Sequence, residues 1–270
     1  MISGWISSEQ IFEVVKMFLS IAILFVLGIQ DLKSRELSET IVYLFLCCSL
    51  IGFIVSTFIL GSMQPILRLA YATISLLVTI GVFLTLYKLN LIGDGDLYIS
   101  TSLGLMFPYP ITYRATLVRT GILPPSLIIV LYASMLGIIF SAINAVIVIS
   151  RHKESLDAMP TKIKMIIPFI AKPVKLIDYL EGKVKHCHPI QVFKVVNGKV
   201  ISEYKFLIDI NQDINEEVKD LINKGSLSPN IYLWVTPGLP YVFHLLLGLI
   251  MLFILGDSPV LLLIFKLFGV

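Results

Sequence analysis

Long apolar runs alternate with short polar segments through most of the chain. A helix needs about 20 apolar residues to cross the hydrocarbon core of a bilayer. We predict that runs near residues 11–30, 41–60, 66–89, 97–107, 126–149 and a last one from about Trp234 form membrane helices, the fourth being short. The tail SPVLLLIFKLFGV is too short to cross and is predicted to be an interfacial or returning helix.

A polar segment with a different pattern separates the fifth and sixth runs. In QVFKVVNGKVISEYKFLIDI, β-branched and aromatic residues flank Asn197-Gly198, which predicts a hairpin with a two-residue turn. NEEVKDLINKG then predicts a short helix that ends at Gly225. The pattern therefore favours an all-α polytopic membrane protein with about six transmembrane helices and a small soluble α+β insert before the last one. The predicted parts are a membrane domain at residues 1–150, an insert at 151–230, and a last helix with its tail at 231–270.

Composition supports the membrane interpretation. Hydrophobic residues make up 57% of the 270 positions, charged residues only 14%, and the mean hydropathy is +0.90. One soluble core cannot hide that much apolar surface, so a lipid bilayer is an expected partner and nucleic acid is not. The three cysteines do not suggest a disulfide framework. The stretch His186-Cys187-His188 has no partner cluster, so neither a metal nor another cofactor is expected.

Basic residues predict the orientation. Lysines recur through residues 151–230, so the insert is expected to face the cytoplasm. Counting back through single crossings places DLKSRELSE and GDGD on that same side, and Lys33 and Arg35 support this independently. The short fourth run is the critical step of the count, because the insert would move outside if that run did not cross.

Acidic side chains gather at the predicted cytoplasmic ends of two helices. Asp31 ends the first run, while Asp94 and Asp96 open the fourth. Two aspartates that share a site cannot both ionise cheaply, so one keeps a proton. The ionised carboxylate can then activate water while the protonated one polarises a carbonyl, which suffices for peptide hydrolysis. Gly93 and Gly95 are expected to permit unusual backbone angles and to leave room for a substrate, although GDGD alone also fits an ordinary solvated turn.

Two motifs carry a family resemblance. IGDGDL resembles the GxGD motif of the GxGD aspartyl proteases, which comprise prepilin peptidases, archaeal preflagellin peptidases and presenilins. QDLKSREL resembles the first catalytic segment of the prepilin and preflagellin branch. The resemblance implies that Asp31 and Asp96 are the catalytic pair and that Asp94, at the variable position, is not catalytic. Glu39 stands where the family often has Asn or Asp, which leaves its role open.

Features outside these two motifs indicate which branch of the family the chain resembles. The chain has no paired CxxC and only a short first loop, so it is more similar to archaeal preflagellin peptidases than to bacterial prepilin peptidases, and methyl transfer is not expected. The resemblance implies partners that are preflagellin or prepilin-like precursors, cut after a short basic leader at the cytoplasmic membrane surface. Glu36 and Glu39, which lie near Asp31, are expected to meet basic residues of that leader.

A third segment, TPGLP, is similar to the Pro-Ala-Leu segment that lines the active site of presenilins. The resemblance implies that Pro237, Gly238, Leu239 and Pro240 help to bind an extended substrate by strand addition. A simple proline start to the last helix explains the same residues equally well.

Two other functions fit the same acids. One is a presenilin-like protease that cuts transmembrane helices, and the other is an ion- or proton-coupled transporter. Three polar residues in the apolar runs are expected to be structural. His244 and Asn144 are predicted to bond between helices, although the position of His244 near TPGLP also fits a role in substrate positioning or proton transfer. Lys16 is predicted to extend toward lipid headgroups.

Overall fold

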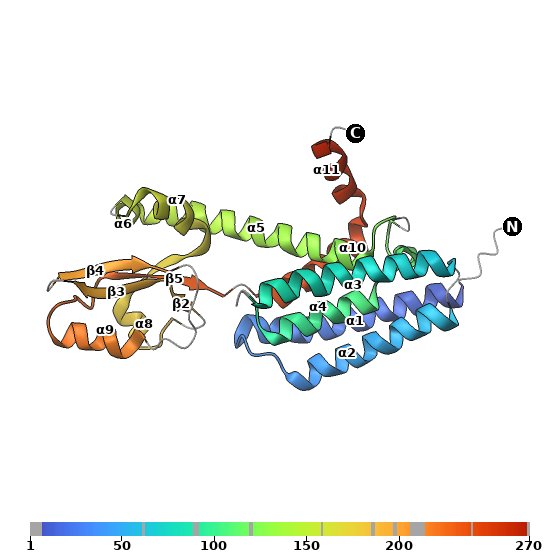
Figure 1. Ribbon diagram of the computed structural model, residues 1–270, viewed down its shortest axis with the longest axis horizontal. Coiled ribbons are helices and arrows are strands. Elements are labelled where there is room, and N and C mark those ends of the chain that lie inside the picture. Colours follow the sequence, from blue (N-terminus) through green and yellow to red (C-terminus); the bar gives the residue numbers. More distant parts are fainter. Residues whose placement is uncertain are drawn as a thin grey trace. The chain divides into compact units, whose positions relative to one another are not determined.

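The computed structural model describes residues 7–60, 63–88, 92–118, 121–157, 159–184, 187–196, 199–205, 214–238 and 240–268. Two compact units make up the chain, one of Met1–Gly137 with Pro240–Val270 and the other of Ile138–Leu239 (Figure 1). Because the first unit contains both ends of the sequence, the second is an insertion within it.

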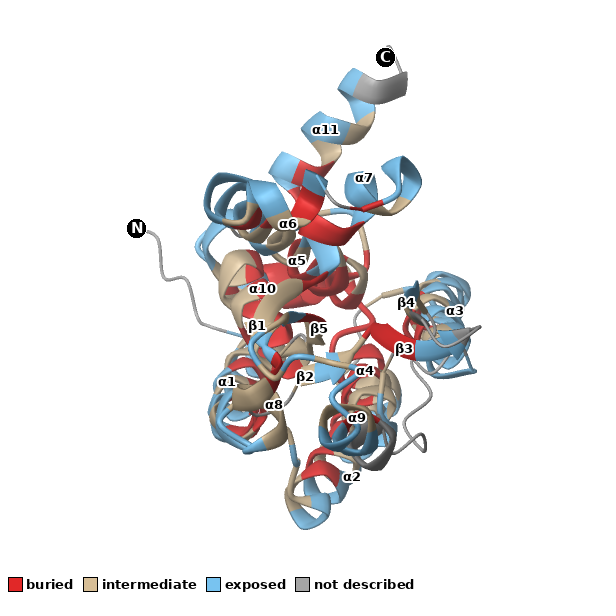
Figure 2. Cartoon of the chain, turned by 90° about the vertical axis from the view of Figure 1, so that its left-hand side faces the viewer, coloured by how far each residue is buried: buried red, intermediate tan, exposed pale blue. Residues whose placement is uncertain are grey.

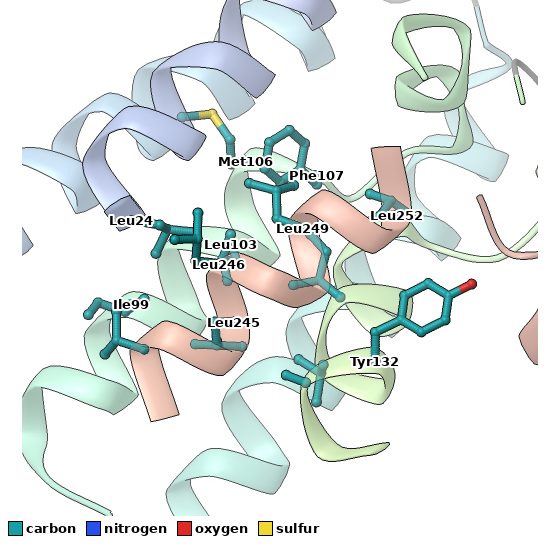
Figure 3. Packing of buried hydrophobic residues seen from close by; sticks show 14 of the residues in the cluster. Leu24, Ile99, Leu103, Met106, Phe107, Tyr132, Leu245, Leu246, Leu249 and Leu252 are labelled. Atoms are coloured by element: carbon teal, nitrogen blue, oxygen red, sulfur yellow. The ribbon is translucent and has the colours of Figure 1, made fainter. Parts of the chain in front are cut away.

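The first unit is helical. Its elements are α1 (Ser8–Lys33), α2 (Glu39–Ile54) with a π-helical continuation η1 (Val55–Ile59), α3 (Pro65–Lys88), α4 (Asp94–Met106), the 3-10 helix η2 (Pro110–Ala115), the start of α5 (Pro125–Arg151), α10 (Tyr241–Leu255) and α11 (Ser258–Phe268). Helix α4 packs against α2 and α3, and α10 packs against α1. Figure 3 shows how the buried side chains of α10 meet those of α1 and α4, with Leu246 close to Leu24 and Leu103.

Four of the described helices, α1, α2 with η1, α3 and α5, are long and apolar enough to cross a membrane. Helices α10 and α11 would form a fifth span if this pair, bent by 91°, is one broken span. The chain is therefore a multi-pass membrane protein, as predicted. The fourth predicted span is α4, which has 13 residues and a length of about 20 Å at 1.5 Å per residue. That length is short of the hydrocarbon core of about 30 Å.

The predicted start of the last membrane helix near Trp234 is wrong. Trp234 lies within strand β5 (Tyr232–Pro237), and α10 begins only at Tyr241. The segment YLWV is rich in aromatic and β-branched residues that fit a buried strand. Pro237 and Pro240 then separate this strand from the helix, because proline has no N–H to continue a ladder or a helix interior.

The second unit joins helices to two small sheets. Its elements are the rest of α5, α6 (Lys153–Asp157), α7 (Thr161–Ile170), β1 (Lys172–Lys175), α8 (Leu176–Leu180), β2 (Cys187–Pro189), β3 (Gln191–Val196), β4 (Lys199–Tyr204), α9 (Ile214–Asn223) and β5. Antiparallel pairing gives one sheet of order β1-β5-β2 and a separate β3-β4 hairpin.

Both local predictions for the insert are confirmed. In the hairpin Val196 pairs with Lys199, so the connection has two residues, although Asn197 and Gly198 themselves lie outside the described residues. Helix α9 is followed by Gly225, whose φ of +68° is the left-handed conformation that a glycine after a helix end adopts.

A buried ion pair holds the far end of α4. The Nζ atom of Lys16 lies 2.7 Å from Oε1 of Glu13 and donates to the carbonyl oxygen of Met106 at 2.9 Å and to Oγ of Ser56 at 3.0 Å. Thr112 donates to the other oxygen of Glu13 at 2.7 Å. The prediction that Lys16 reaches toward headgroups is wrong, because its side chain is only 3% exposed and satisfies the last carbonyl of α4.

Candidate active site

Asp31 lies in the last turn of α1 and faces the start of α10. Its Oδ2 accepts a hydrogen bond from the backbone N–H of Val242 at 2.9 Å, and the backbone N–H of Phe243 also donates to this carboxyl. The residue at the cap position of α10 is Pro240, which makes no side-chain cap bond. Asp31 therefore supplies the missing cap, where the N-terminal end of the helix dipole favours a negative charge.

Two glycines let α10 lie close to its neighbours. A Cβ atom on Gly28 of α1 would lie 3.4 Å from the Cα of Phe243, so the backbones of α1 and α10 are nearly in contact one turn before Asp31. On α10, a Cβ on Gly248 would lie only 2.4 Å from the carbonyl oxygen of Ile129 in α5. The close approach at Gly28 is what brings the first N–H groups of α10 within reach of Asp31.

Arg35 is a site residue that the sequence reasoning did not select. It follows the helix cap Ser34 and has a φ of 58°, a left-handed conformation that is uncommon for residues other than glycine. Its Nη1 atom lies 3.5 Å from Oδ1 of Asp31, and its charge also acts on Asp96. The spacing of four residues between Asp31 and Arg35 is a signal that could have indicated the pair.

Asp96 occupies the first turn of α4. Its Oδ2 accepts a hydrogen bond from the N–H of Gly93 at 3.2 Å, which fixes the carboxyl at the helix start. The carboxyl groups of Asp96 and Asp31 lie close enough for their charges to interact, and Tyr241 of α10 is also within range of Asp96. The ends of α1, α4 and α10 thus bring together two carboxyl groups that are far apart in the sequence.

The remaining residues of GDGD behave differently from Asp96. Asp94 is exposed and its side chain bonds to Tyr87. Gly93 has φ −88° and ψ 170°, and Gly95 lies within α4 without a positive φ, so the expected unusual backbone angles are not found. The two glycines differ in the space that is available for a side chain. A Cβ on Gly93 would meet nothing within 4 Å, whereas one on Gly95 would lie 2.7 Å from Cδ1 of Leu37.

The predicted leader-contacting acids lie in and just after the loop between α1 and α2. Glu36 is exposed, and Glu39 is exposed in the first turn of α2. Across the described part of the chain, neither of them forms an ion pair within 4.0 Å. Both side chains are therefore accessible to a basic peptide.

The TPGLP segment spans the end of β5 and the start of α10. Pro237 pairs with Cys187 of β2, Gly238 follows the strand, and Leu239 lies outside the described residues. Pro240 is the cap residue of α10, so within this segment it lies nearest in the chain to the backbone groups that bond Asp31. The buried ring of His244 approaches the carbonyl oxygen of Pro240 through Nδ1 at 2.7 Å, a contact within the first turn of the same helix.

The stretch His186-Cys187-His188 contains the other side chains that could bind a metal ion. His188 of β2 is exposed, Cys187 is partly buried, and His186 is not among the described residues. Where the structure describes side chains, it contains no group of three or more His, Cys, Asp or Glu residues that could hold a metal ion.

Family models match most of the chain. Residues 18–142 match the model of the type IV leader peptidase family, and residues 163–258 match the model described as Archaeal Peptidase A24 C-terminus Type II. The chain belongs to the type IV leader peptidase family. The first match contains both Asp31 and Asp96, and the second contains the sheets and the start of α10 in this leader peptidase. No curated protein matches the sequence closely enough to add a further relative.

This membership confirms the predicted resemblance to the archaeal preflagellin and prepilin peptidases. It identifies the protein as a membrane peptidase, which disfavours the transporter alternative.

Proposed function

We propose that this membrane peptidase is an aspartic endopeptidase that removes the short basic leader of preflagellins or prepilin-like precursors. The observation that supports this proposal is the approach of Asp31 and Asp96 at the ends of α1 and α4. Each carboxyl is already held by backbone N–H groups, Asp31 by those of α10 and Asp96 by that of Gly93. A pair preorganised in this way can serve acid–base catalysis without a covalent intermediate.

In the proposed mechanism the pair shares one proton. The ionised carboxyl removes a proton from a water molecule, which attacks the scissile carbonyl while the protonated carboxyl donates a hydrogen bond to its oxygen. Collapse of the tetrahedral intermediate returns a proton to the leaving amine. Arg35 contributes a fixed positive charge beside both acids, which favours a single negative charge on the pair.

The proposed site is at the cytoplasmic face of the membrane. We infer this placement from the basic residues of the loop after α1 and of the insert, which lie on the same side when the segment of α4 crosses the membrane. Catalytic groups at helix ends can reach a bond just outside the lipid. This geometry favours leader removal over the cutting of a transmembrane helix, for which a helix would have to unwind inside the bilayer.

The experiment that tests this function uses the purified chain in detergent with a preflagellin and no added metal. We expect a shortened product whose new N-terminus, read by mass spectrometry, lies just before the hydrophobic segment. Cleavage should persist in the presence of a chelator. A product cut inside the hydrophobic segment would instead support the presenilin-like alternative, and no product from any precursor would contradict the proposal.

Glu36 and Glu39 are proposed to contact the leader. Replacing both by alanine should lower kcat/KM for the natural precursor by no more than about fivefold per contact, because exposed ion pairs contribute at most about 1 kcal/mol. The same double variant should show no loss with a precursor whose leader lysines are alanines. The measurement is a double-mutant cycle on cleavage rates. Equal losses of kcat/KM with both precursors would show that these glutamates do not contact the leader lysines.

Gly93 is proposed to leave space for the substrate backbone. Its backbone angles suit any residue and nothing inside the protein fills the position of a Cβ. We therefore expect Gly93→Ala to keep the Tm of the wild type but to lower kcat/KM by about fivefold to 150-fold, since overpacking a fitted contact costs about 1–3 kcal/mol. Gly81→Ala in α3, which also meets nothing within 4 Å, is the matched control and should be fully active. Unchanged kcat/KM in Gly93→Ala would show that no substrate atom approaches there.

A further inference from the structure

Helix α7 has an exposed apolar surface. The exposed fractions are 70% for Met165, 50% for Ile166 and 48% for Phe169, although all three are large hydrophobic residues. Figure 2 shows most of α7 in the colour of exposed residues, with only a short buried stretch. That stretch consists of Ile167, which packs in a core cluster of the second unit, and Pro168, which is also buried. An exposed apolar patch of this kind indicates a surface that contacts either another protein or the lipid bilayer.

The end of α7 is hydrogen-bonded to the transmembrane helix α5, and Figure 1 shows where these two helices lie in the chain. Oγ of Ser141 donates to the carbonyl oxygen of Phe169 at 2.6 Å, and Nδ2 of Asn144 donates to those of Pro168 at 2.8 Å and Ala171 at 3.1 Å. These carbonyls belong to the last turn of α7 and the residue after it, which have no partners within the helix. The predicted interhelical role of Asn144 is confirmed by these bonds.

The position of these bonds along α5 sets the depth of α7. Ser141 and Asn144 lie 16 and 19 residues after Pro125, where α5 begins, which corresponds to about 24 and 28 Å along the helix. The hydrocarbon core is about 30 Å thick. If α5 crosses from its first residue, the end of α7 is near the opposite boundary of the hydrocarbon, where peptide carbonyls must be satisfied by protein groups.

The charged and apolar residues of α7 follow an order that agrees with this depth. Lys162 and Lys164 are exposed in its first turns, at the end away from the bonds to α5, and Lys164 also pairs with Asp157. The apolar residues Met165, Ile166 and Phe169 follow them. A helix with lysines at one end and large apolar residues toward the other suits the boundary between headgroups and acyl chains.

We propose that α7 is a membrane-interface anchor. Its residues Met165, Ile166 and Phe169 insert among lipid acyl chains, while Lys162 and Lys164 lie at the level of anionic headgroups. The insert is then a membrane-bound unit and not a freely soluble one. This proposal concerns the lipid contact of the second unit and does not depend on the catalytic role of Asp31 or Asp96.

The experiment uses the full chain in lipid nanodiscs, with its natural cysteines replaced by serine and one new cysteine labelled with bimane. Met165→Cys is the test position, Ile166→Cys is a second position on the same surface, and exposed Lys224→Cys at the end of α9 is the matched control. We expect acyl-brominated lipids to quench most of the fluorescence at positions 165 and 166, and iodide in the water to quench little. The control should behave in the opposite way.

Several results would overturn the proposal. Iodide quenching at positions 165 and 166 that equals the quenching at position 224 would place α7 in water. Protection of positions 165 and 166 from both quenchers would mean that protein covers the surface. If that protection increased with the protein-to-lipid ratio, the covering protein would be a second copy of the chain.

The headgroup part of the proposal has its own test. Brominated phosphatidylglycerol should quench the label at position 165 more strongly than brominated phosphatidylcholine at equal mole fraction. The double variant Lys162→Gln with Lys164→Gln should abolish this preference, because it removes the two positive charges that attract the anionic headgroups. Each such charge contributes about 1 kcal/mol, or roughly fivefold, to the attraction. A preference that survives both substitutions would show that these lysines do not contact headgroups.

Discussion

Asp31→Asn and Asp96→Asn should each abolish precursor cleavage, with rates at least about 100-fold below the wild type, the lower end of what acid–base groups contribute. An amide can neither remove a proton from water nor donate a shared proton in place of a carboxyl. The fold should survive both changes, because an asparagine oxygen can still accept the N–H bonds of Val242 and Gly93 that the aspartates now accept. The measurement is single-turnover cleavage together with the Tm of each variant.

The controls for this result separate catalysis from helix capping. Asp94→Asn should retain substantial activity, because Asp94 is exposed and bonds to Tyr87 and not to the pair. Asp31→Ala should lose both activity and thermal stability, because it also removes the cap of α10, a loss of about 0.5–2 kcal/mol. Cleavage that persists in either asparagine variant of the pair would contradict the aspartic mechanism.

Lys16→Met should strongly destabilise the protein, because Lys16 is buried and paired. It leaves the carboxylate of Glu13 buried without its cation and the carbonyl of Met106 without its donor. Breaking a buried ion pair by removing one partner typically costs about 3–5 kcal/mol, and the low polarity of a membrane helix bundle gives no water to compensate. We expect a large fall in Tm measured in detergent micelles or nanodiscs.

Lys33→Met is the matched control, because Lys33 lies in the same helix and is exposed. It should unfold at the temperature of the wild type. Adding Glu13→Gln to Lys16→Met should recover part of the lost stability, since the double variant buries no unpaired charge. A Lys16→Met protein as stable as Lys33→Met would show that the pair does not hold the end of α4.

The sequence was sufficient to predict the membrane helices α1, α2, α3 and α5, helix α9 and the β3-β4 hairpin, because each is marked by local spacing, whereas the short helices α6, α7 and α8 were not predicted. It also places Asp31 and Asp96 at helix ends, and their catalytic role stays a prediction. Apolar runs identify helices, Asn197-Gly198 marks a hairpin turn, and the motifs around Asp31 and Asp96 occupy helix ends. The start of the last helix was misplaced because YLWV fits a buried strand and a membrane helix equally well by hydropathy. Pro237 and Pro240 were the local signal that decides between the two.

The contacts between distant segments could not be predicted. Nothing local to Asp31 indicates that its oxygens bond the first N–H groups of α10, more than 200 residues later in the chain. Lys16 was misinterpreted because a lone lysine near a helix end usually reaches toward headgroups. The i,i+3 spacing to Glu13 is a local signal for an ion pair that the sequence analysis did not use. The burial of this pair depends on the packing of η1 and η2 against α1.

The chain that joins β5 to α10 is very short. Only residues 238–240 separate Pro237, the last residue of the strand, from Tyr241, the first residue of the helix. The four Cα–Cα steps between these two residues reach at most about 14 Å when fully extended. Once that slack is used, any displacement of the strand end must pull on the turn whose N–H groups bond Asp31. A ligand that displaces the end of β5 would therefore act through the covalent chain on the backbone N–H groups that bond Asp31.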